Sequence, residues 1–375
     1  MELRIQKADL VAGISTVSRA VPSKTTMSIL ECIMIDAVDG DIKLIANDME
    51  LGIETIIGGE IVTPGKIAVN AGIFSNIIRK LPDNEVKIVT DGEKISITCE
   101  NSEFHILGRS GEDFSYLPVV EKNSEIKLSQ YTLKEMITRT IFSVSSNESS
   151  GMMTGELLEV KENDVRMVAL DGHRISIRKV TLDEAYGNFK VIISGKTLLE
   201  ISRILSGNTT KVCSIYFTGR HILFEFDSTR VVSRLIEGTY YNIDSMLSNS
   251  YMATVKVNRQ KMLDCIDRAT LLVREEDKKP IIVMIRDGSM ELKINTSIGS
   301  MDEVIDIEKN GEDMDIGFNP KFVIDALRAV DDDEVTMYLV SPKAPCFIRN
   351  DIGEEKPEGQ EYCYLILPIN FITVD

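Results

Sequence analysis

Residues 319–330 read NPKFVIDALRAV, and this stretch predicts one amphipathic helix. Asn319 is a suitable N-cap, and Pro320 suits the first helical position. The apolar residues recur at helical spacing and form one face, which consists of Phe322, Val323, Ala326, Leu327 and Val330. Arg328 falls outside that face. The stretch decides the fold because the chain contains related stretches at regular intervals.

Two more helices of the same kind are expected, at residues 70–81 (NAGIFSNIIRKL) and 194–205 (SGKTLLEISRIL). Each is followed by a polar turn and a strand-like run. Their arginines, Arg79, Arg203 and Arg328, are spaced by 124 and 125 residues. A second helix is expected near the start of each third of the chain, at 8–21, 131–144 and 258–273, where it carries Arg19, Arg139 and Arg268.

Tight-turn dipeptides between strand-like runs repeat with the same period. They begin at Asp39, Asn163 and Asp287, each 124 residues after the one before, and apolar residues alternate around them as in β-hairpins. Chance similarity between amphipathic helices does not explain three features with one spacing. The sequence therefore predicts an α+β fold of three repeated domains, each with two helices on antiparallel strands. Polar stretches at 121–125 and 248–250 set the expected limits at 1–124, 125–250 and 251–375.

The composition is that of an ordinary globular protein, with 43% hydrophobic and 27% charged residues in 375. The N-terminus does not resemble a signal peptide, and no apolar run is long enough to span a membrane. The six cysteines are scattered without a CxxC pair, which favours buried reduced thiols in a cytosolic protein.

The net charge of −17, if evenly spread, would argue against nonspecific binding of nucleic acid. The cations, however, gather on or near the expected helices, and the acidic residues crowd the turns. Besides the six arginines, these cations are Lys24, Lys80, Lys134, Lys196, Arg259, Lys261 and Lys321. A single arginine is best explained as part of a solvated face, but six such helices favour a polyanion partner. No aromatic residues alternate with the cations, so phosphate contact is expected and base stacking is not.

The chain resembles the bacterial sliding clamps, the beta subunit and processivity factor of DNA polymerase III. The resemblance runs nearly end to end and is carried by VALDGHRISI (168–177), FNPKFVIDAL (318–327), VSRAVPSKTTMSIL (17–30) and YLILPI (364–369). It implies three DNA-clamp domains per chain and a six-domain ring formed by a head-to-tail homodimer. It also implies a bacterial cytoplasmic protein at the nucleoid, without a cofactor, a metal or a catalytic site of its own.

Duplex DNA would pass through the ring without sequence readout. The expected DNA-facing residues are Arg19, Lys24, Arg79, Arg139, Lys196, Arg203, Arg268 and Arg328. The dimer interface is expected to involve Phe104 and Ile106 on an edge strand of the first domain, with Leu271 and Leu272 on the third.

The resemblance further implies an apolar pocket for short linear motifs of the replicative polymerase, the clamp loader and repair proteins. Its expected residues are Met153, Leu170, Gly172, His173, Arg174, Ile175, Tyr241, Met246, Asn319, Phe322, Leu365, Ile366, Leu367, Pro368 and Ile369. The chain departs from the family where Tyr241 replaces a frequent proline and Ser245 a frequent arginine. It also extends past the usual end, at 371–375.

Two other functions are compatible with parts of the sequence. Asp171 and His173 could serve a metal-dependent hydrolase, but the chain has only three histidines, and none has a second ligand at metal-site spacing. A turn eased by Gly172 explains the same residues. The second alternative is a scaffold that binds proteins, acidic ones among them, through a peptide pocket and does not bind DNA.

Overall fold

The computed structural model describes residues 1–122, 125–273, 279–352 and 360–371. The chain divides into two compact units. The first unit holds Met1–Lys134 and Lys196–Leu235, and the second holds Glu135–Gly195 and Ile236–Asp375. Across the described ranges, no helix combines the length and the hydropathy that crossing a bilayer needs.

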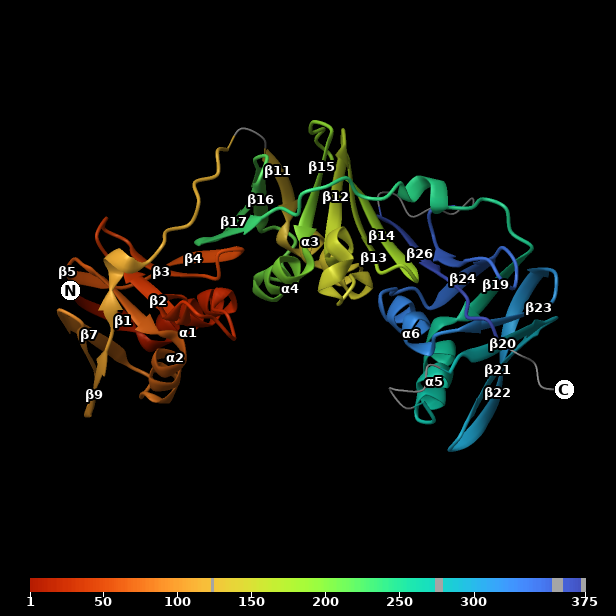
Figure 1. Cartoon of the computed structure of the whole chain (residues 1–375), viewed down its shortest axis with the longest axis horizontal. Helices are drawn as coiled ribbons and strands as arrows, with labels where there is room; N and C mark the ends of the chain where they lie inside the picture. Colours follow the sequence, from red (N-terminus) through yellow and green to blue (C-terminus); the bar gives the residue numbers. More distant parts are fainter. Residues whose placement is uncertain (123–124, 274–278, 353–359, 372–375) are drawn as a thin grey trace. The chain divides into compact units, whose positions relative to one another are not determined.

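The α-helices of the described ranges lie where the repeat predicts them, two in each third of the chain (Figure 1). They are α1 (Lys7–Val17), α2 (Ala71–Lys80), α3 (Gln130–Thr138), α4 (Gly195–Ile204), α5 (Arg259–Thr270) and α6 (Pro320–Arg328). Asn70, Asn258 and Asn319 cap α2, α5 and α6, and each side-chain oxygen accepts a backbone N–H at 2.9–3.0 Å. Two predicted helices end early and continue as 3-10 turns, η1 (Ser18–Ala20) after α1 and η4 (Ile141–Ser143) after α3.

In the described part of the first unit, the strands form two antiparallel sheets. The smaller has the order β5-β1-β7-β8-β9, and the larger has the order β10-β6-β2-β3-β4-β18-β17-β16-β11. The strands of the smaller sheet are β5 (Glu60–Thr63), β1 (Glu2–Gln6), β7 (Glu85–Asp91), β8 (Lys94–Cys99) and β9 (Ser102–Leu107). Those of the larger are β10 (Arg109–Ser110), β6 (Lys66–Asn70), β2 (Cys32–Asp36), β3 (Ile42–Asn47), β4 (Leu51–Ile57), β18 (Thr229–Arg234), β17 (His221–Phe226), β16 (Val212–Phe217) and β11 (Glu125–Ser129).

The described residues of the second unit form one antiparallel sheet with the order β15-β12-β13-β14-β26-β25-β24-β19-β22-β21-β20-β23. Its first strands are β15 (Phe189–Ser194), β12 (Gly155–Lys161), β13 (Asp164–Leu170), β14 (Arg174–Thr181), β26 (Gln360–Ile366) and β25 (Cys346–Arg349). The others are β24 (Glu334–Leu339), β19 (Ala253–Asn258), β22 (Gly299–Gly311), β21 (Ser289–Thr296), β20 (Ile281–Arg286) and β23 (Met314–Phe318).

The predicted hairpins are confirmed, since the three turns connect β2 to β3, β12 to β13 and β20 to β21. Helices α5 and α6 pack against each other on the sheet of the second unit (Figure 1). The apolar face of α6 is buried there, with Val323, Ala326 and Leu327 in the core. All six cysteines are buried and unpaired, as predicted.

Both large sheets run across the borders between repeats. Strand β4 of the first third pairs with β18 of the second, and β14 of the second third pairs with β26 of the third. The two compact units therefore divide the middle third of the chain between them. The expected domain limits stay a prediction, and residues 123–124 at the first limit lie outside the described part.

Candidate functional site

A cavity of about 520 Å³ opens on the second unit, within the size range of small-ligand and peptide pockets. Most residues predicted for the pocket surround it. Its lining is Met153, Leu170, Gly172, His173, Arg174, Ile175, Tyr241, Met246, Pro345, Leu365 and Leu367. Tyr241, Met246 and Leu367 are more than one-third exposed, so the rim presents apolar surface to solvent.

One wall is the turn between β13 and β14, which Asp171 shapes. Its Oδ1 accepts the backbone N–H of His173 at 3.0 Å and that of Arg174 at 3.2 Å. Gly172 has a φ of +87°, a backbone conformation that other residues rarely adopt. The Asp171 carboxylate is thus engaged in holding the turn, which agrees with the turn interpretation and does not favour Asp171 as a base that acts with His173.

Arg174 joins this wall to helix α6. Its Nε donates to Asp171 Oδ2 at 3.0 Å, its Nη1 donates to Asp325 Oδ2 at 2.6 Å, and its Nη2 donates to the carbonyl of Phe142. Its guanidinium carbon lies 4.4 Å from the ring centre of Phe322. Two carboxylates therefore neutralise the one cation of the wall, and the cavity is suited to an apolar ligand.

The first turn of α6 reaches this wall through Phe322, whose ring stacks on His173 at a centroid distance of 6.2 Å. Asn319 does not line the cavity, because its side-chain oxygen caps the helix through the N–H of Lys321.

The structure corrects the prediction for part of the C-terminal run. Leu365 and Leu367 line the cavity, whereas Ile366 points to the opposite face of β26, into the core with α5 and α6. Neighbouring residues of an extended chain face opposite sides, so Ile366 points away from the side on which Leu365 and Leu367 lie. Pro368 and Ile369 also lie outside the lining, and the backbone N–H of Ile369 bonds to Gly317. Sequence reasoning missed Pro345, which precedes β25.

The opposite wall comes from the segment 236–252, which brings Tyr241 and Met246 to the cavity. Tyr240 anchors this segment by donating its hydroxyl to the carbonyl of Val168 at 3.2 Å. A second anchor is the ion pair of Arg166 Nη1 with Asp244 Oδ1 at 2.6 Å, and the hydrogen bond from Arg166 lowers the pKa of Asp244. Asp244 belongs to the 3-10 turn η6 (Ile243–Met246), so this ion pair helps to hold Met246 in place.

Arg166→Met should weaken peptide binding three- to tenfold, about 1 kcal/mol, because Asp244 loses its ion pair; Arg166 also pairs with Glu159, and that contact is lost as well. Fluorescence anisotropy with a labelled apolar peptide measures the affinity. Lys179→Met is the matched control, since it breaks ion pairs with Asp164 and Glu361 away from the cavity lining. An equal loss of affinity in both variants would contradict a positioning role for Arg166.

The predicted DNA-facing cations fall into two groups. Lys24 and Arg79 are exposed, and neither has an ion-pair partner within the described ranges. Others are held by carboxylates: Lys196 by Asp48, Arg19 and Arg203 by Glu200, Arg268 by Glu303, and Arg328 by Asp267. Arg328 is the residue predicted to lie outside the apolar face of α6, and its side chain is 59% exposed.

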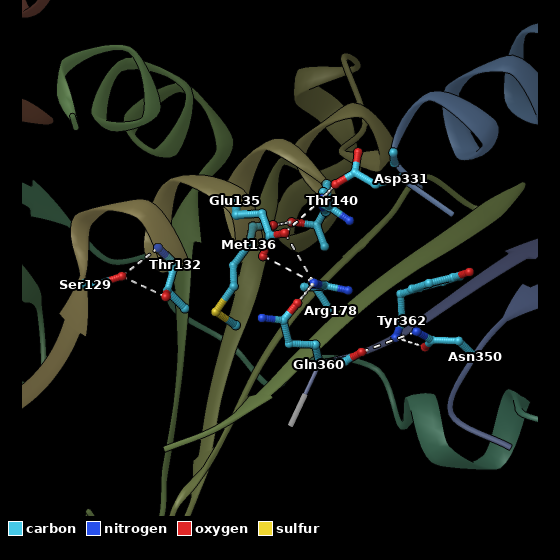
Figure 2. A network of polar contacts seen from close by, with 12 residues as sticks. Ser129, Thr132, Glu135, Met136, Thr140, Arg178, Asp331, Asn350, Gln360 and Tyr362 are labelled. Atoms are coloured by element: carbon cyan, nitrogen blue, oxygen red, sulfur yellow. Dashed lines mark hydrogen bonds and ion pairs between the residues drawn. The ribbon is translucent and has the colours of Figure 1, made fainter. Parts of the chain in front are cut away.

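Arg139 does not fit the prediction. It follows the end of α3, its side chain is only 13% exposed, and its Nη2 is paired with Glu135 at 2.8 Å and with Asp331. Glu135 also pairs with Arg178, which donates to Gln360 (Figure 2). Arg139 is therefore a structural cation of the second unit, and we remove it from the DNA-facing set.

The predicted interface residues lie on two separate elements. Phe104 and Ile106 are on β9, which forms the end of its sheet and pairs only with β8 among the described strands. Leu271, just after α5, is 80% exposed, whereas Leu272 is partly buried against the core. Leu107 on β9 and Val304 on β22 are exposed apolar residues that sequence reasoning missed.

Comparisons with known proteins agree along the whole chain. Family models of the DNA polymerase III beta subunit match it in order: the N-terminal domain at 1–118, the central domain at 127–242 and the C-terminal domain at 245–369. The chain is 32% identical to the beta sliding clamp of Staphylococcus aureus over 98% of its length and 99% of that protein.

Solved structures give the same result. A protein from Eubacterium rectale assigned as a DNA polymerase III beta subunit is 57% identical, with a TM-score of 0.94 over 99% of both chains. The DNA polymerase sliding clamp of Bacillus subtilis is 30% identical, with a TM-score of 0.93 over 99% of this chain and 100% of that one.

Proposed function

This chain belongs to the bacterial DNA polymerase III beta-subunit family and is a DNA sliding clamp of the replicative polymerase, and we propose that two copies close head to tail around duplex DNA. One observation supports the ring: the same type of strand pair joins consecutive repeats inside the chain. Among the described strands, one strand of each type has no partner of the other type.

Two strands of each repeat correspond between the repeats: the third strand that follows the first helix, and the third strand that follows the second helix. The first type is β4, β14 and β22, and the second type is β9, β18 and β26. Inside the chain, β4 pairs with β18 and β14 pairs with β26, both antiparallel. The strands left over are β22 and β9. A second copy would supply β9 to β22 and β22 to β9, which closes a ring of six domains.

Both leftover strands have a free side in the described part of the chain. Strand β22 pairs with β21 along Gly299–Asp306 and turns to β19 only from Ile307 onward. Apolar side chains flank the two edges, with Leu107 exposed on β9 and Val304 on β22. Burying them at a chain-to-chain contact would favour the dimer. This arrangement supports Phe104, Ile106 and Leu271 as interface residues.

The proposed ring holds DNA by enclosing it, and its cations contact phosphates without reading bases. The cavity of the second unit takes short apolar segments of the polymerase, the clamp loader and repair proteins. The protein acts without a catalytic site or cofactor of its own, in the bacterial cytoplasm at the nucleoid. The limits 1–124, 125–250 and 251–375 are proposed as the three domains.

Retention on circular DNA tests the enclosure. The chain, loaded by its clamp loader with ATP onto a nicked circle, should stay on the DNA through gel filtration at high salt and leave after the circle is cut. A Phe104→Lys, Leu107→Lys variant should run as a monomer of 41.9 kDa and should not be retained. Equal retention on cut and uncut DNA would contradict enclosure. Peptide binding without any retention would favour the scaffold.

A further inference from the structure

Glu200 of α4 holds two of the proposed DNA-facing arginines at once. Its Oε2 accepts from Arg19 Nη1 at 2.9 Å, and its Oε1 accepts from Arg203 Nη1 at 2.6 Å. Arg19 comes from η1 of the first repeat and Arg203 from α4 of the second, and all three residues belong to the first unit. One carboxylate thus accepts hydrogen bonds from two guanidinium groups.

The three side chains differ in their access to solvent. The side chain of Glu200 is 15% exposed, while those of Arg19 and Arg203 are 29% and 50% exposed. The carboxylate is therefore the most enclosed member, and the guanidinium groups keep surface that a phosphate can reach. The group carries one net positive charge although it contains two arginines.

A phosphate and a carboxylate use the same N–H groups of arginine. Ion pairs of this partly exposed kind are weak, so a phosphate can replace the carboxylate at little cost. Each such exchange leaves Glu200 without that partner and beside the polyanion, which opposes the new contact. The arginines can therefore touch passing phosphates but gain little by holding them.

We propose that Glu200 competes with DNA phosphates for Arg19 and Arg203, and so limits how firmly the clamp holds the duplex. Glu200 is a positioning residue that acts through the two arginines. The inference rests on the proposed enclosure of DNA. It accounts for a DNA-facing set in which most cations have a carboxylate partner, whereas Lys24 and Arg79 have none within the described ranges.

Glu200→Gln tests the inference, because it removes the charge and keeps the size of the side chain. Clamps are loaded onto a nicked circle, the circle is cut, and the rate at which they slide off is measured over a range of salt concentrations. The variant should leave three- to tenfold more slowly at low salt, with the difference lost at high salt. Its equilibrium binding to a short duplex should have a salt slope steeper by about 1 to 2, one for each arginine freed.

Glu225→Gln is the matched control. Glu225 also joins two cations, Lys122 at 2.5 Å and Arg230 at 3.0 Å, and its loss changes the net charge equally. It lies on β17, on the same sheet face as Leu223, which packs against Val120, and its partner Lys122 belongs to the same segment as Val120. Its departure rate and salt slope should equal those of the unmodified chain.

Two further variants separate charge from fold. Glu200→Asp keeps the carboxylate and should restore most of the original salt slope. Adding Arg19→Gln and Arg203→Gln to Glu200→Gln should cancel the slower departure. If Glu200→Gln matches either the unmodified chain or Glu225→Gln, the competition is refuted and the clamp function stands. If no variant, and not even the unmodified chain, is retained on the nicked circle, the enclosure itself is refuted.

Discussion

Arg174→Ala should lower the free energy of unfolding by about 3 kcal/mol and weaken peptide binding by more than about tenfold. The substitution leaves Asp171 and Asp325 without their shared cation, and both carboxylates are at least four-fifths buried. It also removes the contacts of Arg174 with α6, including that with Phe322. Urea denaturation measures the stability, and fluorescence anisotropy with a labelled peptide measures the affinity.

Arg178→Ala is the control for this prediction. Arg178 lies four residues further along β14, on the same face, and its side chain is 3% exposed and paired with Glu135 (Figure 2). It does not line the cavity. Its loss should cost similar stability while the peptide affinity changes less than twofold. If both variants lose affinity equally, Arg174 acts on the cavity only through general stability.

Glu156→Gln should make the protein more stable at neutral pH and remove a pH dependence. Glu156 on β12 is fully buried, and burial raises its pKa to about 8 although Thr140 donates a hydrogen bond to it at 2.8 Å. At a pH between about 4.5, the ordinary pKa, and about 8, Glu156 is thus protonated in the folded state and ionised in the unfolded state. Stability therefore falls as the pH rises from about 4.5 to about 8.

The expected gain of Glu156→Gln is about 3 kcal/mol at pH 7, because glutamine needs no proton to stay neutral. Denaturation at several pH values between 5 and 8 measures it. Glu159→Gln on the same strand should behave in the opposite way. Burial works against its charged form, but Lys190, Arg166 and Lys161 outweigh burial and lower the pKa of Glu159. Its replacement should destabilise the protein at pH 7. A flat profile for the unmodified chain would contradict the Glu156 prediction.

The sequence predicts the features that depend on near neighbours. The helices begin at Asn70, Asn258 and Asn319 because each asparagine can cap the N–H groups that follow it. The hairpins follow from turn residues between alternating runs. Most of the cavity lining came from family resemblance. The alternation of a strand could have excluded Ile366 once Leu365 and Leu367 were placed on the cavity side.

Features that depend on distant partners were not accessible to that reasoning. Arg139 has the spacing of a DNA-facing arginine, yet Asp331, which pairs with it, lies 192 residues away. Pro345 reaches the cavity only because β25 pairs with β26. The continuation of each large sheet across a repeat border is likewise set by strand pairing, which the local pattern does not specify.

The strand pairs at the repeat borders determine where the proposed ring is mechanically weakest. Inside the chain, consecutive repeats are joined by a covalent connection as well as by the sheet. The segment that contains Val120 packs over β16 to β18, and Arg166 and Arg349 bind Asp244 and Ser248 of the segment 236–252. A junction between β9 of one chain and β22 of another would have backbone hydrogen bonds of the same kind but no covalent connecting segment. A force that acts equally on all six domain junctions would therefore separate the ring first at the two junctions between chains.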